Sequence, residues 1–130
     1  MSAEAHIKTI LEDYLNTETD LKGYVRAKAE ASKMYTSLLS KHTSSDHSYS
    51  IHTAAPVIGA YEEIKNLNQL EQEATRKLHE ISKKIKEYIR ALNGCPLEAS
   101  FSFDSLNHRA GTHTFYLEND ELKIRHSLVS

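Results

Sequence analysis

A heptad repeat of apolar residues between positions 57 and 92 limits most strongly what this chain can fold into. One series, spaced by seven, is Val57, Ile64, Glu71, Leu78, Ile85 and Leu92. The companion series, three residues later, is Ala60, Leu67, Ala74, Ile81 and Tyr88. Glu71 is the polar member of the repeat. An apolar seam that lasts for about five heptads predicts a long helix of the coiled-coil kind.

The ends of this helix carry recognisable signals. Thr53 is the expected N-cap, and Pro56 then falls in the first turn, where its missing N–H costs little. Gly94 is expected to take the left-handed conformation just past the helix, and Pro96 blocks continuation.

Residues 3 to 41 carry a weaker seam, which predicts a second long helix. Its members are Ile7, Leu11, Tyr14, Glu18, Leu21, Val25, Lys28, Ser32, Tyr35 and Leu39. The phase continues across residues 16–23, which favours one helix over two, with Thr19 or Asp20 as the cap of a second helix in the alternative. The stretch from about 42 to 53 is rich in Ser, Thr and His and predicts an exposed loop.

The charges favour an antiparallel hairpin of the two helices over residues 3–93. Each helix is acidic early and basic late, so a parallel pair would set acid against acid. An antiparallel pair places Glu12 opposite Lys84, Asp13 opposite Lys83 and Lys33 opposite Glu63. It also brings Lys28 and Glu71 within about one turn, as a polar layer of the kind that fixes register.

After Gly94 the apolar period changes to two, which predicts strands. The segments are LEASFSF (97–103), THTFYLE (112–118) and LKIRHSLV (122–129), with a turn at Asn119–Asp120. We expect the open end of the hairpin to cover the apolar side of this sheet. The predicted fold is therefore α+β, one domain of residues 1–130: a long antiparallel two-helix coiled-coil hairpin followed by a small three-stranded antiparallel β meander at 96–129.

The turn at Asn119–Asp120 sets His113 opposite His126 on the apolar side of the sheet. We expect Phe103 beside them, with Asp104 and His108 in the adjoining loop. One hypothesis is a metal or proton-transfer site at His113, His126 and His108. The hypothesis we favour is a pair of ordinary core-rim histidines, whose mutual repulsion when protonated loosens the sheet in acid.

Composition excludes several classes of function. The net charge is −2 and the pI is about 6.4, so no basic field attracts nucleic acid. The single cysteine, Cys95, excludes an internal disulfide, fits a reducing compartment, and is expected to be a small buried residue. The first 15 residues lack the features of a signal peptide, and the longest apolar run, AAPVIGAY, is too short to cross a membrane. We expect a cytoplasmic protein.

No catalytic or cofactor motif is present in the sequence. It contains no Gly-rich phosphate loop, His-Glu-x-x-His, Gly-x-Ser-x-Gly or Cys-x-x-Cys, and the histidines of the loop at 42, 47 and 52 match no metal-ligand spacing. We expect no cofactor and no enzymatic activity.

The hypothesis that remains is a non-enzymatic assembly or adaptor subunit that acts through its coiled-coil helices. The expected interaction residues are Lys28, Ile64, Leu67, Glu71, Leu78, Ile81 and Ile85. Apolar residues beyond one seam indicate a homo-oligomer, most simply a dimer, or a helical partner; they are Ile10, Leu38, Ile58, Leu70 and Ile89. The alternative is a small metal- or ligand-binding protein, or an enzyme, that uses the His-rich sheet face.

Overall fold

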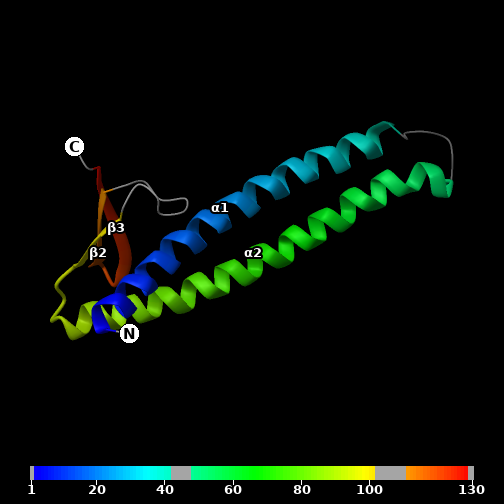
Figure 1. Ribbon diagram of the computed structural model, residues 1–130. Coiled ribbons are helices and arrows are strands. Elements are labelled where there is room, and N and C mark those ends of the chain that lie inside the picture. The colour runs from blue at the N-terminus through cyan, green and yellow to red at the C-terminus, as the bar shows by residue number, and fades with distance from the viewer. Residues whose placement is uncertain (1, 42–47, 102–110, 129–130) are drawn as a thin grey trace. The chain divides into compact units, whose positions relative to one another are not determined.

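Two long helices packed together precede a three-stranded antiparallel sheet, which confirms the predicted α+β class (Figure 1). The computed structural model describes residues 2–41, 48–101 and 111–128. The helices are α1 (Ala3–Lys41) and α2 (Ile51–Ala91). The strands are β1 (Leu97–Phe101), β2 (Gly111–Glu118) and β3 (Glu121–Leu128). Residues 42–47 of the expected loop lie outside the described residues.

The chain divides into two compact units, which are described separately. The sheet unit comprises Met1–Thr19 and Arg76–Ser130, and so contains the start of α1, the end of α2 and all three strands. The hairpin unit is Asp20–Thr75. In the described part of the chain, no helix is both long and apolar enough to cross a membrane.

Helix α1 is continuous through residues 16–23, as its apolar phase predicted. Ser2 caps it, since its Oγ accepts a hydrogen bond from the Ala5 N–H at 3.1 Å. Thr19, the alternative cap of a second helix, instead donates its hydroxyl to the Leu15 carbonyl at 3.0 Å. A hydroxyl that bonds to the carbonyl one turn earlier has its hydrogen-bond partner within the helix, and the backbone hydrogen bonds of the helix continue past it.

Helix α2 begins earlier than predicted, so the assignment of Thr53 as N-cap was wrong. Ser50 is the cap, because its Oγ accepts a hydrogen bond from the Thr53 N–H at 3.1 Å. Pro56 therefore lies in the second turn. Ser is the better N-cap of the two, so the residue preference already favoured Ser50 over Thr53.

The C-terminal end of α2 differs from the prediction by one residue. The Gly94 N–H bonds to the Ile89 carbonyl at 2.9 Å and the Asn93 N–H to the Arg90 carbonyl at 3.0 Å. This pattern makes Asn93, with φ 65°, the left-handed residue of the cap, and Gly94 follows with φ 86°. Asn tolerates this conformation better than other residues with side chains.

On α1 one of the two predicted heptad series is confirmed, namely Tyr14, Leu21, Lys28 and Tyr35, whereas the other is shifted by one residue. Ala31 is 7% exposed, whereas the predicted member Val25 is 47% exposed. The buried or half-buried series is Tyr14, Thr17, Leu21, Tyr24, Lys28, Ala31, Tyr35 and Leu38. One residue turns a helix by 100°, so Val25 and Leu39 move out of the helix contact. The seam of α2 is confirmed from Val57 to Tyr88, although Leu92 at its end is exposed.

In the hairpin unit the predicted polar layer is confirmed. Lys28 Nζ lies 2.5 Å from Glu71 Oε2 and 3.4 Å from Asn68 Oδ1. Tyr35 and Tyr61 also meet, with ring centroids 6.4 Å apart. Both contacts join α1 to α2 and agree with the predicted antiparallel direction.

The surface ion pairs expected from the charge pattern are not formed among the described residues. Lys33 lies 3.7 Å from Glu30 and Lys84 lies 4.0 Å from Glu87, each on its own helix. Exposed pairs contribute little energy, so their exact partners are not fixed by the charge pattern.

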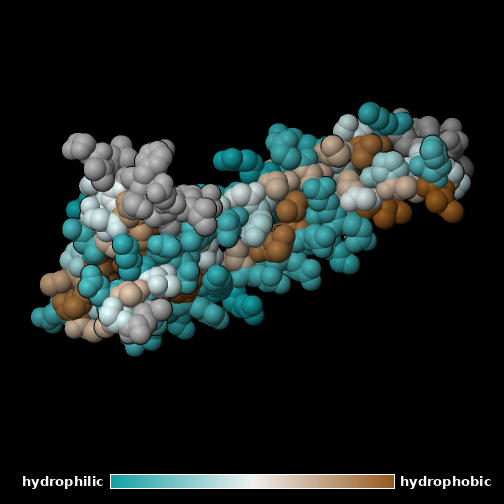
Figure 2. Space-filling view, viewed as in Figure 1, coloured by the Kyte–Doolittle hydropathy of each residue, from teal (hydrophilic) through white to brown (hydrophobic). Residues whose placement is uncertain are grey.

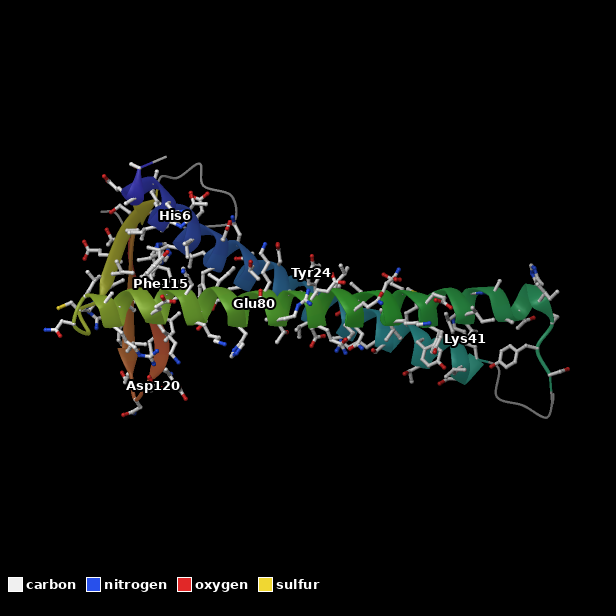
Figure 3. All side chains as sticks on the ribbon, turned by 90° about the horizontal axis from the view of Figure 1, so that it is seen from below. His6, Tyr24, Lys41, Glu80, Phe115 and Asp120 are labelled. Carbon is white, nitrogen blue, oxygen red and sulfur yellow. The ribbon has the colours of Figure 1, made fainter. Side chains whose placement is uncertain are left out.

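The sheet has the predicted order and register. Its order is β1-β2-β3, and Glu118 faces Glu121 across a tight turn in which Asn119 and Asp120 have φ 53° and 63°. Two positive φ angles are typical of the type I′ hairpin turn. Asp120 lies at the tip of this hairpin (Figure 3) and accepts a hydrogen bond from Arg90 at 2.5 Å. This bond, with the charge of Lys86, lowers the pKa of Asp120.

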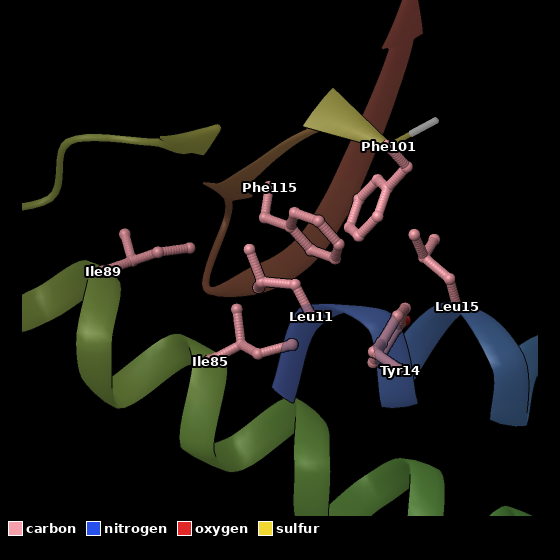
Figure 4. Packing of buried hydrophobic residues seen from close by; sticks show 7 residues of the cluster. All are labelled: Leu11, Tyr14, Leu15, Ile85, Ile89, Phe101 and Phe115. Carbon is pink, nitrogen blue, oxygen red and sulfur yellow. The ribbon is translucent and has the colours of Figure 1, made fainter. Parts of the chain in front are cut away.

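The core of the sheet unit lies between the sheet and the two helices, as expected (Figure 4). Its buried members are Leu11, Tyr14, Leu15, Ile85, Ile89, Phe101 and Phe115. The rings of Tyr14 and Phe115 meet edge to face at 5.9 Å. The start of α1 and the end of α2 thus cover the apolar side of the sheet.

Candidate functional site

The histidines of β2 and β3 are in direct contact, which confirms the predicted pairing. His113 faces His126 in the register, and their rings are stacked with centroids 4.1 Å apart and planes 16° apart. His113 is 6% exposed, and His126 is half-buried. The pairing follows from the tight turn, because the turn fixes which residues stand opposite each other.

A hollow of about 370 Å³ lies beside the histidine pair, and α1 contributes part of its wall. Its lining residues are Tyr14, Leu15, Glu18, His113, Leu122, Lys123, Ile124 and His126. The ring of Phe101 stands against His113 at 5.3 Å. The expected neighbours Phe103, Asp104 and His108 lie outside the described residues.

Sequence reasoning missed Tyr14 and Glu18 as members of this site. They lie about a hundred residues from the histidines, and only tertiary packing brings them near. Their spacing of four places them on one side of a helix, but in the sequence this spacing looked like part of the helix–helix seam.

The stacked arrangement is poorly suited to a metal ion. A shared metal needs ring nitrogens that converge on one point, whereas two nearly parallel rings direct theirs side by side. Within residues 2–41, 48–101 and 111–128, no group of three or more His, Cys, Asp or Glu residues is placed to hold one. The loop positions His42 and His47 are outside these ranges, and His52 lies exposed at the start of α2.

Tyr14 brings a protonated phenol to this hollow. The side chain is 8% exposed, and burial raises the pKa of its hydroxyl, with a further contribution from the nearby Glu18 carboxylate. Both effects oppose the phenolate, so at neutral pH the group can donate but not accept a proton.

Because the pKa of Tyr14 is raised on folding, the protein should lose stability in alkali. The contribution is fully present below the unfolded pKa of about 10 and disappears as the pH rises through the folded value. Tyr14→Phe is expected to remove this part of the alkaline loss. Denaturant unfolding between pH 8 and 11 measures it, with Tyr49→Phe at an exposed position outside the helix–helix contact as control. Equal alkaline loss in Tyr14→Phe and native protein would contradict the prediction.

Loosening of the sheet in acid stays a prediction. Two imidazolium rings 4.1 Å apart, one of them almost fully buried, would repel each other and be poorly solvated. His113→Phe keeps the ring and removes one charge, so this variant should lose less stability in mild acid. Amide exchange of β2 and β3 at pH 5 and pH 7 measures the effect. Identical acid responses in the variant and native protein would refute it.

The seven expected interaction residues lie on the inner sides of the chain's own helices. Lys28 and Glu71 pair with each other, and Ile85 is completely buried in the core. The other four, Ile64, Leu67, Leu78 and Ile81, are half-buried.

The apolar residues that were expected to be exposed outside the helix–helix seam are not all exposed. Ile58 and Leu70 are exposed as expected, whereas Ile89 is completely buried under the sheet. Cys95 is exposed, contrary to expectation. The exposed large hydrophobic residues of the hairpin unit are Val25, Met34, Leu39, Tyr49, Ile51, Ile58, Tyr61 and Leu70.

Comparison with known proteins gives no relative for this arrangement. No protein-family model matches the chain, and no curated protein or solved structure is significantly similar to it.

Proposed function

We propose that the protein is a non-enzymatic assembly subunit that associates with a second copy through the outer sides of the hairpin unit. The supporting observation is the set of exposed large hydrophobic residues in this unit. Scattered apolar residues are normal on a surface, but residues in a regular row are typical of an interface.

The row on α2 has the spacing of a second helix–helix seam. Ile51, Ala54, Ile58 and Tyr61 follow one another at intervals of three, four and three residues. Ile51 is 90% exposed and Ile58 56% exposed. We call these four residues the outer stripe. Brown side chains gather on the hairpin unit near the helix ends that flank residues 42–47 (Figure 2).

Helix α1 adds to the apolar surface of the same unit. Val25 and Leu39 stand two heptads apart, one residue away from the buried seam. A helix pair that carries apolar residues outside its own seam has the surface that is needed to pack on a second pair as a four-helix bundle. A second copy supplies the same pair of helices, so two hairpins can bury both stripes around a two-fold axis.

The cytoplasm is the compartment that we propose for this subunit. The single cysteine is exposed, and a reducing environment keeps such a thiol free.

Ligand binding at the histidine hollow is the second candidate function. The observation that favours it is the concentration of Tyr14, Glu18, Lys123 and two histidines around about 370 Å³. Such convergent polar groups are typical of small-molecule sites. Metal content and bound small molecules in protein purified without a His-tag test this candidate by mass spectrometry.

Light scattering at micromolar concentration tests the assembly proposal. We expect a dimeric mass for native protein and a monomeric mass for Ile58→Glu, because a charge in the outer stripe cannot be buried without a partner. Gln69→Glu is the matched control, since it adds the same charge at an exposed position of α2 outside the stripe. A monomeric native protein at tens of micromolar, or a dimeric Ile58→Glu, would overturn the proposal.

A further inference from the structure

The turn that joins α2 to β1 contains a dipeptide with a chemistry of its own, Asn93–Gly94. The chain has six asparagines, and Asn93 is the one that glycine follows. Both residues of the dipeptide are exposed. Glycine has no Cβ to shield its backbone nitrogen, so the side-chain amide of a preceding asparagine can approach that nitrogen closely. Asn93 is therefore the asparagine of this chain that is most open to intramolecular attack.

An attack of this kind is the first step of deamidation. The Gly94 backbone nitrogen gives its proton to a base in the solvent and bonds to Cγ of Asn93. The Cγ–Nδ2 bond breaks, and ammonia leaves with a proton from the solvent. Water then opens the five-membered succinimide ring at either of its two carbonyls, which leaves aspartate or isoaspartate at position 93. The reaction as a whole consumes one water molecule and releases one molecule of ammonia.

In the folded chain the end of α2 opposes this reaction. The Gly94 N–H donates to the Ile89 carbonyl at 2.9 Å, so the attacking nitrogen holds its proton in a hydrogen bond. Asn93, with φ 65°, is in the left-handed conformation and donates its own N–H to Arg90 at 3.0 Å. Its Cα–C bond becomes part of the planar ring, so this residue must leave the left-handed conformation before the ring closes. Deamidation therefore requires that the helix end opens.

Packing in the sheet unit holds this helix end closed. Ile89 is completely buried in the core, with Ile85 one turn earlier (Figure 4). Leu92, in the turn that follows α2, is 45% exposed. The buried side chain of Ile89 thus fixes the turn that carries its own carbonyl, the acceptor of the Gly94 N–H.

We propose that Asn93 is a deamidation site whose rate is controlled by the packing of Ile89, and that its modification loosens the join between α2 and β1. The product places a negative charge beside the last carbonyls of the helix, which form the negative end of its dipole. Isoaspartate also adds a methylene carbon to the backbone, so the hydrogen bonds of this turn no longer fit together. Ammonia is lost to the solvent, so the change accumulates with the age of each chain.

Peptide mapping by mass spectrometry, on protein aged in mildly alkaline buffer, tests the site. The peptide that contains Asn93 should gain the mass difference between an amide and an acid and should separate into aspartate and isoaspartate forms. Denaturant should raise its rate about tenfold or more, because opening breaks at least two backbone hydrogen bonds, each worth roughly a factor of five.

Asn119 is the internal control for this measurement. It is also exposed and left-handed, with φ 53°, but Asp120 follows it in place of glycine. Its peptide should change much more slowly than that of Asn93 in the unfolded chain. Equal rates at the two asparagines in denaturant, or equal rates for Asn93 in folded and unfolded protein, would overturn the proposal.

Two substitutions near the end of α2 test the control by packing. Ile89→Val removes one buried methylene and keeps the carbonyl that accepts the Gly94 N–H, so deamidation of the folded protein should be about fivefold faster. Leu92→Ala removes more of a side chain, but from an exposed position, and should change the rate by less than about twofold. An unchanged rate in Ile89→Val, or equal acceleration in both variants, would contradict the control by Ile89.

Amide exchange of aged protein tests the loosening of the join. The N–H groups of Gly94 and Cys95, which bond to α2 and to the turn, should lose protection as the modified fraction grows. Asn93→Gly adopts the left-handed conformation without strain and lacks the side-chain amide, so this variant should keep its protection over the same time. Equal loss in both proteins, or full protection in modified native protein, would show that deamidation does not loosen the join.

Discussion

Gly111→Ala is expected to lower the free energy of unfolding by about 3 kcal/mol or more. Gly111 begins β2 with φ 138°, a conformation that residues with side chains rarely adopt. A Cβ at this position would collide with the carbonyl oxygen of Ser127 and approach Nε2 of His126 to 3.1 Å. Neither neighbour can yield easily, because one is backbone of the adjoining strand and the other is held in the histidine stack.

The two helical glycines supply the matched control. Gly23 and Gly59 lie within helices, and a Cβ added at either position would meet nothing within 4 Å. Alanine at these positions should raise the free energy of unfolding by about 0.5–1 kcal/mol, since alanine favours the helix. Chemical denaturation of all three variants measures the contrast. A stabilised Gly111→Ala, or equal changes in the three, would contradict the backbone placement of β2.

Phe115→Ala should lower the free energy of unfolding by about 3–5 kcal/mol. The ring is completely buried, stands edge to face with Tyr14, and lies between Leu97 and Ile124 in the sheet. Its removal leaves a cavity that elements from three parts of the chain would have to move together to fill.

Ile51→Ala is the comparison for Phe115→Ala. Its side chain is 90% exposed, so the change in the free energy of unfolding should stay within about 0.5 kcal/mol. Denaturant unfolding of dilute protein, where association does not contribute, measures both variants. A loss below about 1 kcal/mol for Phe115→Ala would show that the sheet does not pack on the helices.

The helices differed in how well the sequence predicted them. The α2 seam is strongly apolar at both heptad positions, so its buried side was assigned correctly from Val57 to Tyr88. On α1 the two possible series are similar, because each mixes apolar and polar members. The residues that decide between them are Thr17 and Ala31, which are buried although they are small and only weakly hydrophobic, so a pattern of large apolar residues does not single them out.

The sequence predicted the part of the candidate site that depends on strand register. The turn at Asn119–Asp120 determines the contact between His113 and His126, and turn chemistry is local information. Tyr14 and Glu18 enter the site through the crossing of α1 over the sheet, which no short pattern encodes. The burial of Ile89 has the same origin, since the sheet covers it.

The sheet unit is built from segments far apart in the sequence, so it cannot be completed until late in synthesis. Leu11 and Tyr14 are made about a hundred residues before Phe115, the residue that they cover. At a translation rate of roughly 5–20 residues per second, about 5–20 s pass between the synthesis of these apolar side chains and the synthesis of the strand residues that they pack against. The hairpin unit, by contrast, is complete before the first strand is made. The nascent chain therefore passes through a stage in which one half can fold while the start of α1 still exposes a surface that chaperones recognise.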